Sequence, residues 1–325
     1  MHGKGARLAG RRYLPDVPSS SPSCPLCGSA LVTRDRTLQR TAILAEWREW
    51  LDLDIGNELQ GMPEIPQWRC GACGLVFYPA QASGTAALYE QLQSFPWYYL
   101  GDKWEYDEAL RDIAPGARVC EAGCGRGDFV ARVMRERRAD VLGLELNADA
   151  VRGARAAGLP VEERSLESAA AEQPGSFDVV CSFQVLEHVP NPGEHLRAAH
   201  ALLKPGGRLL LGLPNNDSFL GREDNILDRP PHHISRWSLE VARTAFPALG
   251  FRVLRTANEP LTAFHTRSWV LAQLRTRVAA QLPGPLARLV VRPRIISLLE
   301  WLLTSTGWHR HLLGQTLYVM AERVD

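Results

Sequence analysis

The sequence lacks a long apolar run and an excess of either charge. Its 325 residues carry 37 Lys and Arg against 36 Asp and Glu, and a net charge of +1 argues neither for nor against a nucleic-acid partner. The most apolar stretch, residues 295–303, is short and contains Glu300, whereas a membrane-spanning helix needs about 20 apolar residues. Residues 1–23 are basic and then rich in Pro and Ser, without the apolar segment of a signal peptide. These absences favour a cytoplasmic protein, and 45% hydrophobic residues are enough to build a core.

Four of the seven cysteines form two C-x-x-C pairs, Cys24 with Cys27 and Cys70 with Cys73. In a cytoplasmic chain this pattern favours a metal over a disulfide. Two such turns bring four thiolates to one ion, which is typical of structural zinc. A pair of redox dithiols is the alternative, and it is disfavoured because neither pair precedes a thioredoxin-like unit. A closed four-thiolate site leaves no position for a reactive water, so we expect no catalysis there.

From residue 118 onward, short apolar runs alternate with amphipathic stretches, and no internal repeat is visible. The pattern predicts strands at 118–121, 141–145, 161–163, 177–182, 208–213 and 251–257, a closing strand at 315–322, and helices at 129–137, 148–157, 192–203 and 238–249. Alternating strands and helices at this spacing indicate an α/β fold with a doubly wound, mainly parallel sheet.

A glycine-rich segment, Glu121-Ala-Gly123-Cys124-Gly125-Arg-Gly127, links the first of these strands to a helix. Glycines allow a tight turn and close approach to a ligand, and a helix N-terminus suits a carboxylate or phosphate. A dinucleotide fingerprint would need a third glycine where Asp128 stands. Glu121 would also repel a pyrophosphate.

Glu145 ends the second strand, about twenty residues beyond the glycines, where a carboxylate can accept both hydroxyls of a ribose. A surface carboxylate at a strand end is the simpler alternative, and the glycine segment and Glu121 weaken that alternative.

The acidic-x-G-x-G-x-G segment resembles motif I of class I S-adenosylmethionine-dependent methyltransferases. The resemblance continues, in the right order, through residues 176–189, 203–210, 248–251 and 315–323. It implies a Rossmann-like, seven-stranded sheet with a small N-terminal zinc-ribbon-like module and a helical insertion before the last strand. Several bacterial small-molecule methyltransferases look similar in having such a cysteine module. The expected division is a flexible tail (1–23), the zinc module (24–80), a helical lead-in (81–115), the methyltransferase core (116–264), a helical insertion or lid (265–313) and the closing strand (314–325).

The same resemblance implies which residues hold S-adenosylmethionine. They are Glu121, Gly123, Cys124, Gly125, Gly127, Glu145, Leu146, Ser165, Leu166, Phe183 and Gln184. Members of the family often carry an acidic residue near the adenine amino group. Here Ser165 stands at the corresponding position, so Ser165 or backbone groups replace the carboxylate in this interpretation and Leu166 packs on the adenine.

Three histidines are the candidates for acid–base catalysis: His188 after the fourth strand, and the adjacent His232 and His233 in the loop after the fifth. A structural role is the alternative for each, either in the turn after strand four or in ordering the loop. We expect the site to open over this loop, and Tyr98 and Tyr99 to close the cofactor pocket from the N-terminal side, with plain packing as the alternative.

Residues 265–313 contain seven arginines, one acidic residue and three interleaved tryptophans. A helical cover, or a lid over an anionic substrate, is favoured over an amphipathic surface that rests on a membrane.

Three functions fit the sequence. The favoured one is a methyltransferase acting on oxygen, nitrogen or carbon of a small-molecule acceptor, such as a sugar or a natural-product or lipid precursor. The second is an RNA- or protein-modifying methyltransferase that grips its substrate through the zinc module. The mixture of basic and acidic residues between Cys24 and Cys73 disfavours a nucleic acid there. The third is a non-enzymatic zinc-ribbon binding protein, which the intact Glu121, glycines and Glu145 disfavour.

Overall fold

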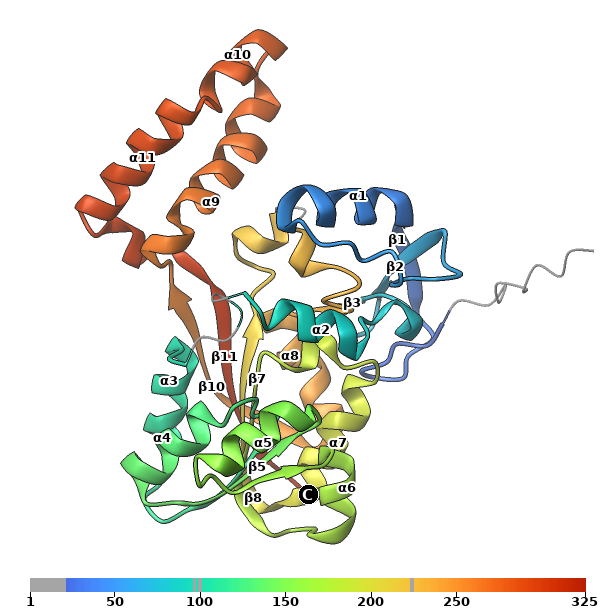
Figure 1. Cartoon of the computed structure of the whole chain (residues 1–325), viewed down its shortest axis with the longest axis vertical. Helices are drawn as coiled ribbons and strands as arrows, with labels where there is room; N and C mark the ends of the chain where they lie inside the picture. Colours follow the sequence, from blue (N-terminus) through green and yellow to red (C-terminus); the bar gives the residue numbers. More distant parts are fainter. Residues whose placement is uncertain (1–21, 96–97, 99–100, 223–224) are drawn as a thin grey trace, which may run out of the picture.

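The chain folds around two sheets, a large one that carries the glycine segment and a small one built mostly from the N-terminal region (Figure 1). The computed structural model describes residues 22–325 except 96–97, 99–100 and 223–224. The tail expected at 1–23 therefore lies, as far as residue 21, outside the described residues.

The large sheet has seven strands in the order β10-β11-β8-β7-β4-β5-β6. Their bounds are β4 (Arg118–Ala122), β5 (Asp140–Glu145), β6 (Val161–Glu163), β7 (Phe177–Phe183), β8 (Leu203–Pro214), β10 (Phe251–Pro260) and β11 (Leu313–Arg323). Strand β11 pairs antiparallel with β8 and β10, whereas β8, β7, β4, β5 and β6 are mutually parallel. The predicted seven-stranded, mainly parallel sheet is confirmed.

The chain reverses its direction of travel across the sheet between β4 and β7. From β4 it proceeds to β5 and β6, and it then returns to the other side of β4 to form β7 and β8. In such sheets a ligand binds beyond the carboxyl ends of the strands at this reversal. The ends of β4 and β7 are therefore where a site is expected.

Helices cover both faces of this sheet. On one face lie α3 (Trp104–Asp112), α4 (Asp128–Arg137) and α5 (Ala148–Ala156), and on the other α6 (Leu166–Glu172), α7 (Pro192–Leu202) and α8 (Leu239–Ala245). Side-chain caps begin several of them: Asn147 accepts from the amide of Ala150, and Ser238 accepts from the amide of Val241. Two packed cores result, one between each helix layer and the sheet.

Most elements follow the sequence pattern, with three differences. The seven-residue helix α6 was not predicted, because it is short and its start was interpreted as part of a binding loop. The helix predicted at 238–249 ends at Ala245 and continues as a 3₁₀ turn over Phe246–Leu249, where Pro247 has no N–H to donate. Strand β8 begins at Leu203 and includes the predicted turn at 204–207.

The small sheet joins the cysteine region to the rest of the chain. Its order is β1-β2-β3-β9, with β1 (Val32–Gln39), β2 (Glu64–Cys70), β3 (Val76–Phe77) and β9 (Ser235–Arg236). Helices α1 (Arg40–Leu51) and α2 (Ala86–Leu92) pack in the same layer around the buried Ile43, Trp47, Ile65 and Leu88. Because β9 belongs to the loop after β8, the N-terminal region is bonded to the loop that carries His232 and His233.

Residues 263–305 form a helical arm that projects away from the large sheet (Figure 1). It comprises α9 (Ala263–Gln273), a π-helical turn over Leu274–Val278, α10 (Gly284–Val290) and α11 (Pro293–Ser305). Several large apolar side chains of the arm are exposed, among them Trp301 at 61% and Leu298 at 55%. Among the described residues, no helix combines the length and the apolar character needed to cross a membrane.

Candidate cofactor and acceptor site

Three glycines with left-handed backbones connect β4 to α4. The φ angles are +71° for Gly123, +54° for Gly125 and +82° for Gly127, a region that residues with a Cβ rarely adopt. Space is a second reason for glycine: a Cβ on Gly123 would lie 2.5 Å from Cγ2 of Val185. The loop therefore lies close against the segment that follows β7.

The Glu145 carboxylate is held at the end of β5 by three backbone amides. Its Oε2 accepts from Gly125 at 2.8 Å, and its Oε1 accepts from Leu146 and Asn147 at 2.8 Å each. A carboxylate has about four lone-pair sites, so an acceptor position remains on Oε2. The arrangement fixes the side chain beside the glycine loop and suits a ribose hydroxyl.

Glu121 is a buried carboxylate at the end of β4. It is 2% exposed, and its Oε2 has no hydrogen-bond partner among the described residues. Burial raises the pKa of Glu121 to about 8, against a smaller lowering by the charge of Lys103. A cationic group of a ligand would compensate this carboxylate, which fits the ammonium of S-adenosylmethionine.

The adenine end of the predicted pocket has a mixed outcome. Ser165 is the N-cap of α6, and its hydroxyl accepts from the amide of Ser168 at 3.2 Å. Leu166 is 3% exposed and packs in the core, whereas Leu146 is 71% exposed beside Glu145. Of the two predicted leucines, only Leu146 presents its side chain to a ligand in this conformation.

Two predicted cofactor-binding residues, Phe183 and Gln184, lie at the end of β7, the first in the core and the second in the loop that follows. Phe183 is 4% exposed, and its ring lies 4.7 Å from that of Phe129 and 5.2 Å from that of Tyr106. Gln184 has a φ of +57°, and its side-chain amide donates to Glu105 at 3.2 Å. Cys124 is also buried, with its thiol beside Gly143. The side chains of Phe183 and Cys124 thus pack beneath the loop.

The three predicted histidines come together, although 44 residues separate the first two in sequence. The ring centroids lie 4.7 Å apart for His188 and His232, 4.9 Å for His188 and His233, and 4.5 Å for His232 and His233. His188 ends the 3₁₀ turn Leu186–His188 after β7, and the other two follow the turn Ile226–Asp228. The cluster therefore stands on the segment that touches the glycine loop through Val185.

The histidine cluster is covered rather than open. Only 7% of His232 is exposed. Oη of Tyr89 on α2 lies 3.3 Å from Nδ1 of His188, and Oη of Tyr98 lies 3.3 Å from Nε2 of His232. The expectation of a site open over this loop is therefore wrong in this conformation, because the aromatic lead-in packs on it. Tyr99 lies outside the described residues.

All three imidazoles are oriented through Nδ1. Nδ1 of His188 lies 2.7 Å from the carbonyl of His232, and Nδ1 of His232 lies 2.9 Å from the carbonyl of Leu227. Nδ1 of His233 lies 3.3 Å from Oδ1 of Asp228. Carbonyls and carboxylates only accept, so each Nδ1 carries the proton and each Nε2 keeps its lone pair. Burial lowers the pKa of His188 to about 4 and the pKa values of the other two well below their ordinary value.

Two acidic residues and one lysine at this site were missed from the sequence. Glu187 is fully buried, neither of its carboxylate oxygens has a hydrogen-bond partner among the described residues, and burial raises its pKa to about 8. Its Oε1 lies 3.8 Å from Nε2 of His188 and 4.0 Å from Nε2 of His233. The charge of Lys103, just before α3, lowers the pKa of both Glu187 and Glu121. Glu105 is 3% exposed and accepts from Gln184. The one sequence signal that could have identified any of them is that Glu187 directly precedes the candidate His188.

The four cysteines meet in space as their spacing predicts. The Sγ atoms of Cys24 and Cys73 lie 3.7 Å apart and those of Cys27 and Cys70 lie 3.6 Å apart, with all four within 4.8 Å of one another. Zn–S bonds of about 2.3 Å in a tetrahedron place sulfur atoms about 3.8 Å apart. The thiolate set therefore fits a tetrahedral zinc ion.

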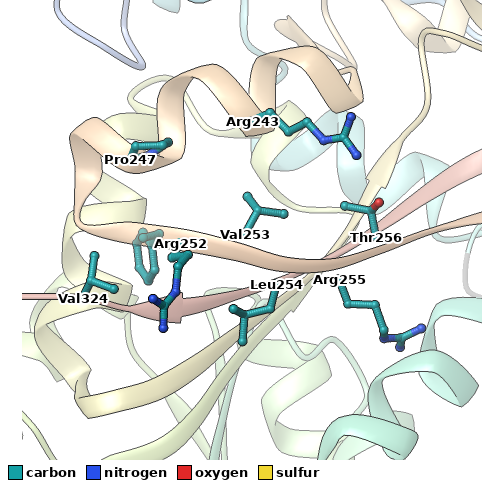
Figure 2. A pocket seen from close by; sticks show the side chains of 9 residues that line it. Arg243, Pro247, Arg252, Val253, Leu254, Arg255, Thr256 and Val324 are labelled. Carbon is teal, nitrogen blue, oxygen red and sulfur yellow. The ribbon is translucent and has the colours of Figure 1, made fainter.

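A surface hollow of about 490 Å³ lies elsewhere, between α8 and β10 (Figure 2). Its lining includes Arg243, Phe251 and Arg255. Phe251 pairs with Arg323 at the edge of the sheet where the parallel strands begin. The hollow thus lies at the end of the sheet where the parallel strands begin, whereas the glycine loop lies where they end. The buried carboxylates and the histidines, rather than this hollow, mark the candidate site.

Comparison with known proteins gives the same region a family. A family model described as a methyltransferase domain matches residues 101–256, which include the glycine loop, Glu145 and all three histidines. Residues 101–256, which carry most of the large sheet, thus resemble a methyltransferase domain.

Curated relatives match a shorter part of the chain at higher identity than the solved structures do. A ubiquinone biosynthesis O-methyltransferase from Xanthomonas campestris pv. campestris (strain B100) is 44% identical over 113 residues, which are 33% of this chain and 47% of the relative. A protein of the same description from Xanthomonas oryzae pv. oryzae (strain PXO99A) is 40% identical over 143 residues, 40% of this chain and 59% of the relative. The chain thus spans about half the length of these relatives.

Solved structures resemble the chain more distantly. An S-adenosylmethionine-dependent methyltransferase from Mesorhizobium loti is 21% identical with a TM-score of 0.45, and the match covers 69% of this chain and 100% of that one. A methyltransferase from Archaeoglobus fulgidus is 18% identical with a TM-score of 0.45, covering 67% and 90%.

Proposed function

We propose that this protein transfers the methyl group of S-adenosylmethionine to a hydroxyl oxygen of a small-molecule acceptor. The proposal rests on where the predicted binding and catalytic residues lie in the sheet. The glycine loop with Glu121 and Glu145, and the cluster of three histidines, stand at the carboxyl ends of neighbouring strands where the chain reverses across the sheet.

The cofactor would lie over the glycine loop. Glu121 faces the methionine ammonium, Glu145 accepts from the ribose, and Leu146 with the cap of α6 at Ser165 borders the adenine. The left-handed glycines keep Cβ atoms away from the ligand. Phe183, Leu166 and Cys124 support this surface from within the core.

The histidines would handle the proton of the acceptor. Methyl transfer needs alignment of the nucleophile, the methyl carbon and the sulfonium, together with removal of a proton where the nucleophile is a hydroxyl. Imidazoles with strongly lowered pKa values are neutral at neutral pH, and their Nε2 lone pairs can accept a proton, that of His232 once the Tyr98 hydroxyl has moved away. For the acceptor to reach them, the cover formed by Tyr89 and Tyr98 must move aside.

The oxygen acceptor is supported by the relatives, which are described as O-methyltransferases. Their description names a quinone pathway. The position of the histidines behind Tyr89 and Tyr98 suits a phenolic or similar hydroxyl better than a polymer. A nucleic-acid or protein substrate gripped by the zinc module has less support, because β3 of that region already pairs with β9 of the histidine loop.

The cysteine cluster would hold one structural zinc ion. The ligand set supplies four thiolates and no open position, so the ion would stabilise the two turns rather than take part in the reaction. Through β3 and β9, this module supports the loop of His232 and His233.

The test is formation of S-adenosylhomocysteine during incubation with S-adenosylmethionine and a panel of phenols, catechols and sugars. We expect turnover with hydroxylated aromatic acceptors and loss of turnover in His188→Asn, His232→Asn and His233→Asn, with cofactor affinity retained. His311→Asn, an exposed histidine away from the site, is the matched control. Cofactor binding without turnover of any acceptor would contradict the proposed function.

A further inference from the structure

We infer that His188, His232 and His233, together with Glu187, form a binding site for one divalent transition-metal ion, separate from the four-cysteine site. Within the described residues, the only groups of three or more potential ligands that converge on one point are the cysteine cluster and these three histidines. The ligand nitrogens of the histidines lie within 4.8 Å of one another.

The first argument is the orientation of the rings. Histidines that bind metals almost always donate the other ring N–H to a carbonyl or carboxylate, which fixes the tautomer and aims the free nitrogen. Here every Nδ1 has such an acceptor: the carbonyl of His232, the carbonyl of Leu227 and the carboxylate of Asp228. Asp228 is itself held by Arg236 at 2.6 Å. Histidines that served only to pack the loop would not all need an acceptor for the Nδ1 hydrogen.

The second argument is an uncompensated carboxylate. Glu187 is 0% exposed, and neither of its oxygens has a hydrogen-bond partner among the described residues, although such groups are costly to bury. Its Oε1 points toward the free nitrogens of His188 and His233 at 3.8 and 4.0 Å. A divalent cation among the three imidazoles would give these buried oxygens the polar partner that they lack among the described residues.

The chemistry of the ligand set selects the metal. Imidazole nitrogen suits Zn²⁺, Co²⁺, Ni²⁺ and Fe²⁺, whereas Mg²⁺ and Ca²⁺ prefer a set made of oxygen atoms. Bonds of about 2.0–2.1 Å in a tetrahedron place ligand atoms about 3.3 Å apart. The cluster is wider than this, so binding would contract it and break the contact between Tyr98 and Nε2 of His232.

This inference deepens the proposed function, and its use in methyl transfer depends on that function. With their Nε2 lone pairs bound to the ion, the imidazoles would not take the proton themselves. The ion would instead make an acceptor hydroxyl bound to it ionise more readily than a free one. Binding of the ion does not depend on turnover, so a count of metal ions tests the site whether or not an acceptor is found.

The experiment measures metal per chain by mass spectrometry in the full-length protein, saturated with Zn²⁺ or Co²⁺ and then freed of excess ion. We expect two ions per chain in the wild type and one ion in His188→Asn, His232→Asn or His233→Asn. Asparagine retains a donor near the position of Nδ1, which preserves each anchoring bond, and it removes Nε2. His311→Asn should retain two ions, and Tyr98→Phe should retain two because it removes only the competing hydroxyl.

Cobalt gives a second readout. Thiolate-to-cobalt charge-transfer absorption from the cysteine site should persist in all three asparagine variants, and it reports that the chain remains folded there. Affinity for the second ion should fall by about tenfold or more in Glu187→Gln. One ion per chain in the saturated wild type, or two ions in all three asparagine variants, would overturn the inference.

Discussion

The backbone amide of Ile234 donates to the carbonyl of Glu187 at 2.8 Å. This hydrogen bond joins the turn after β7 to the loop after β8, and so it holds His188 beside His232 and His233. Two backbone amides from the N-terminal region donate to carbonyls of the same loop. The amide of Gly84 donates to the carbonyl of Pro231 at 2.7 Å, and the amide of Tyr78 donates to the carbonyl of Ile234 at 2.9 Å. The histidine loop is thus fixed from both sides, by the turn after β7 and by residues 78–84.

Removing the carboxylate of Glu145 should weaken binding of S-adenosylmethionine. In Glu145→Ala, a ribose acceptor is lost and three backbone amides lose their partner, so we expect at least a tenfold loss of affinity by isothermal titration calorimetry. Glu163→Ala is the control, because that exposed carboxylate pairs with Glu145 in strand register but lies one strand further out. Equal affinity in the wild type and Glu145→Ala would remove Glu145 from the site.

Gly125→Val should also abolish cofactor binding, because its φ of +54° is strained for a β-branched residue. Gly284→Val on the arm, where a Cβ would meet nothing within 4 Å, is the matched control. Unchanged affinity in Gly125→Val would show that the loop does not hold the cofactor.

Cofactor binding should depend on pH through Glu121. The folded pKa of about 8 is raised above the unfolded value, so the free protein keeps the proton below pH 8. An ammonium group favours the ionised carboxylate, and binding therefore releases a proton. Affinity should rise by up to about tenfold per pH unit as the pH approaches 8 and then level off. Glu121→Gln should flatten this profile, and an unchanged slope in that variant would assign the proton elsewhere.

The same shift has a consequence for stability without cofactor. Stability contributed by the protonated, buried Glu121 is present below the unfolded pKa and is lost as the pH rises through about 8. We therefore expect Glu121→Gln to raise the melting temperature of the free protein more at pH 8 than at pH 5. A larger gain at the acidic end would contradict the raised pKa.

Zinc at the cysteine cluster should support the histidine loop. Cys24→Ser should lower the zinc content and the melting temperature, and it should increase amide hydrogen exchange in β9 because β3 pairs with that strand. Cys181→Ser alters a buried thiol in the large sheet and should leave the zinc content unchanged. Equal zinc in Cys24→Ser and the wild type would remove the cysteine site.

Arg255 on β10 should stabilise the wall of the site through α3. It pairs with Glu108 at 2.7 Å and with Asp112 at 2.6 Å, and both carboxylates are largely buried. Arg255→Met removes the cation that both carboxylates share and leaves Glu108 only Arg111 and Asp112 only the Tyr318 hydroxyl. It should cost about 2 kcal/mol in urea unfolding. Arg252→Met, on the same strand, removes only an exposed pair with Glu322 and should cost less than about 1 kcal/mol. Equal losses would contradict this difference in burial.

The sequence by itself determined the positions of the strands of the large sheet along the chain, the glycine loop and the four cysteine ligands. Each of these features depends on residues close together in sequence. Apolar runs predict strands, glycines mark positive φ angles, and a C-x-x-C turn presents two thiolates. The three histidines were identified as candidates one by one, because a histidine after a strand of a parallel sheet is recognisable without knowledge of its neighbours.

Only the tertiary structure decided that these histidines form one cluster and that Tyr89 and Tyr98 cover them. It also decided that the Glu187 carboxylate is buried beside them with no hydrogen-bond partner among the described residues. It also decided that Leu166 lies in the core while Leu146 is exposed. Burial and convergence depend on contacts between segments distant in sequence, such as β3 with β9 and Ile234 with Glu187. No periodicity or spacing in the chain records those contacts, because they arise from packing of separate elements against one another.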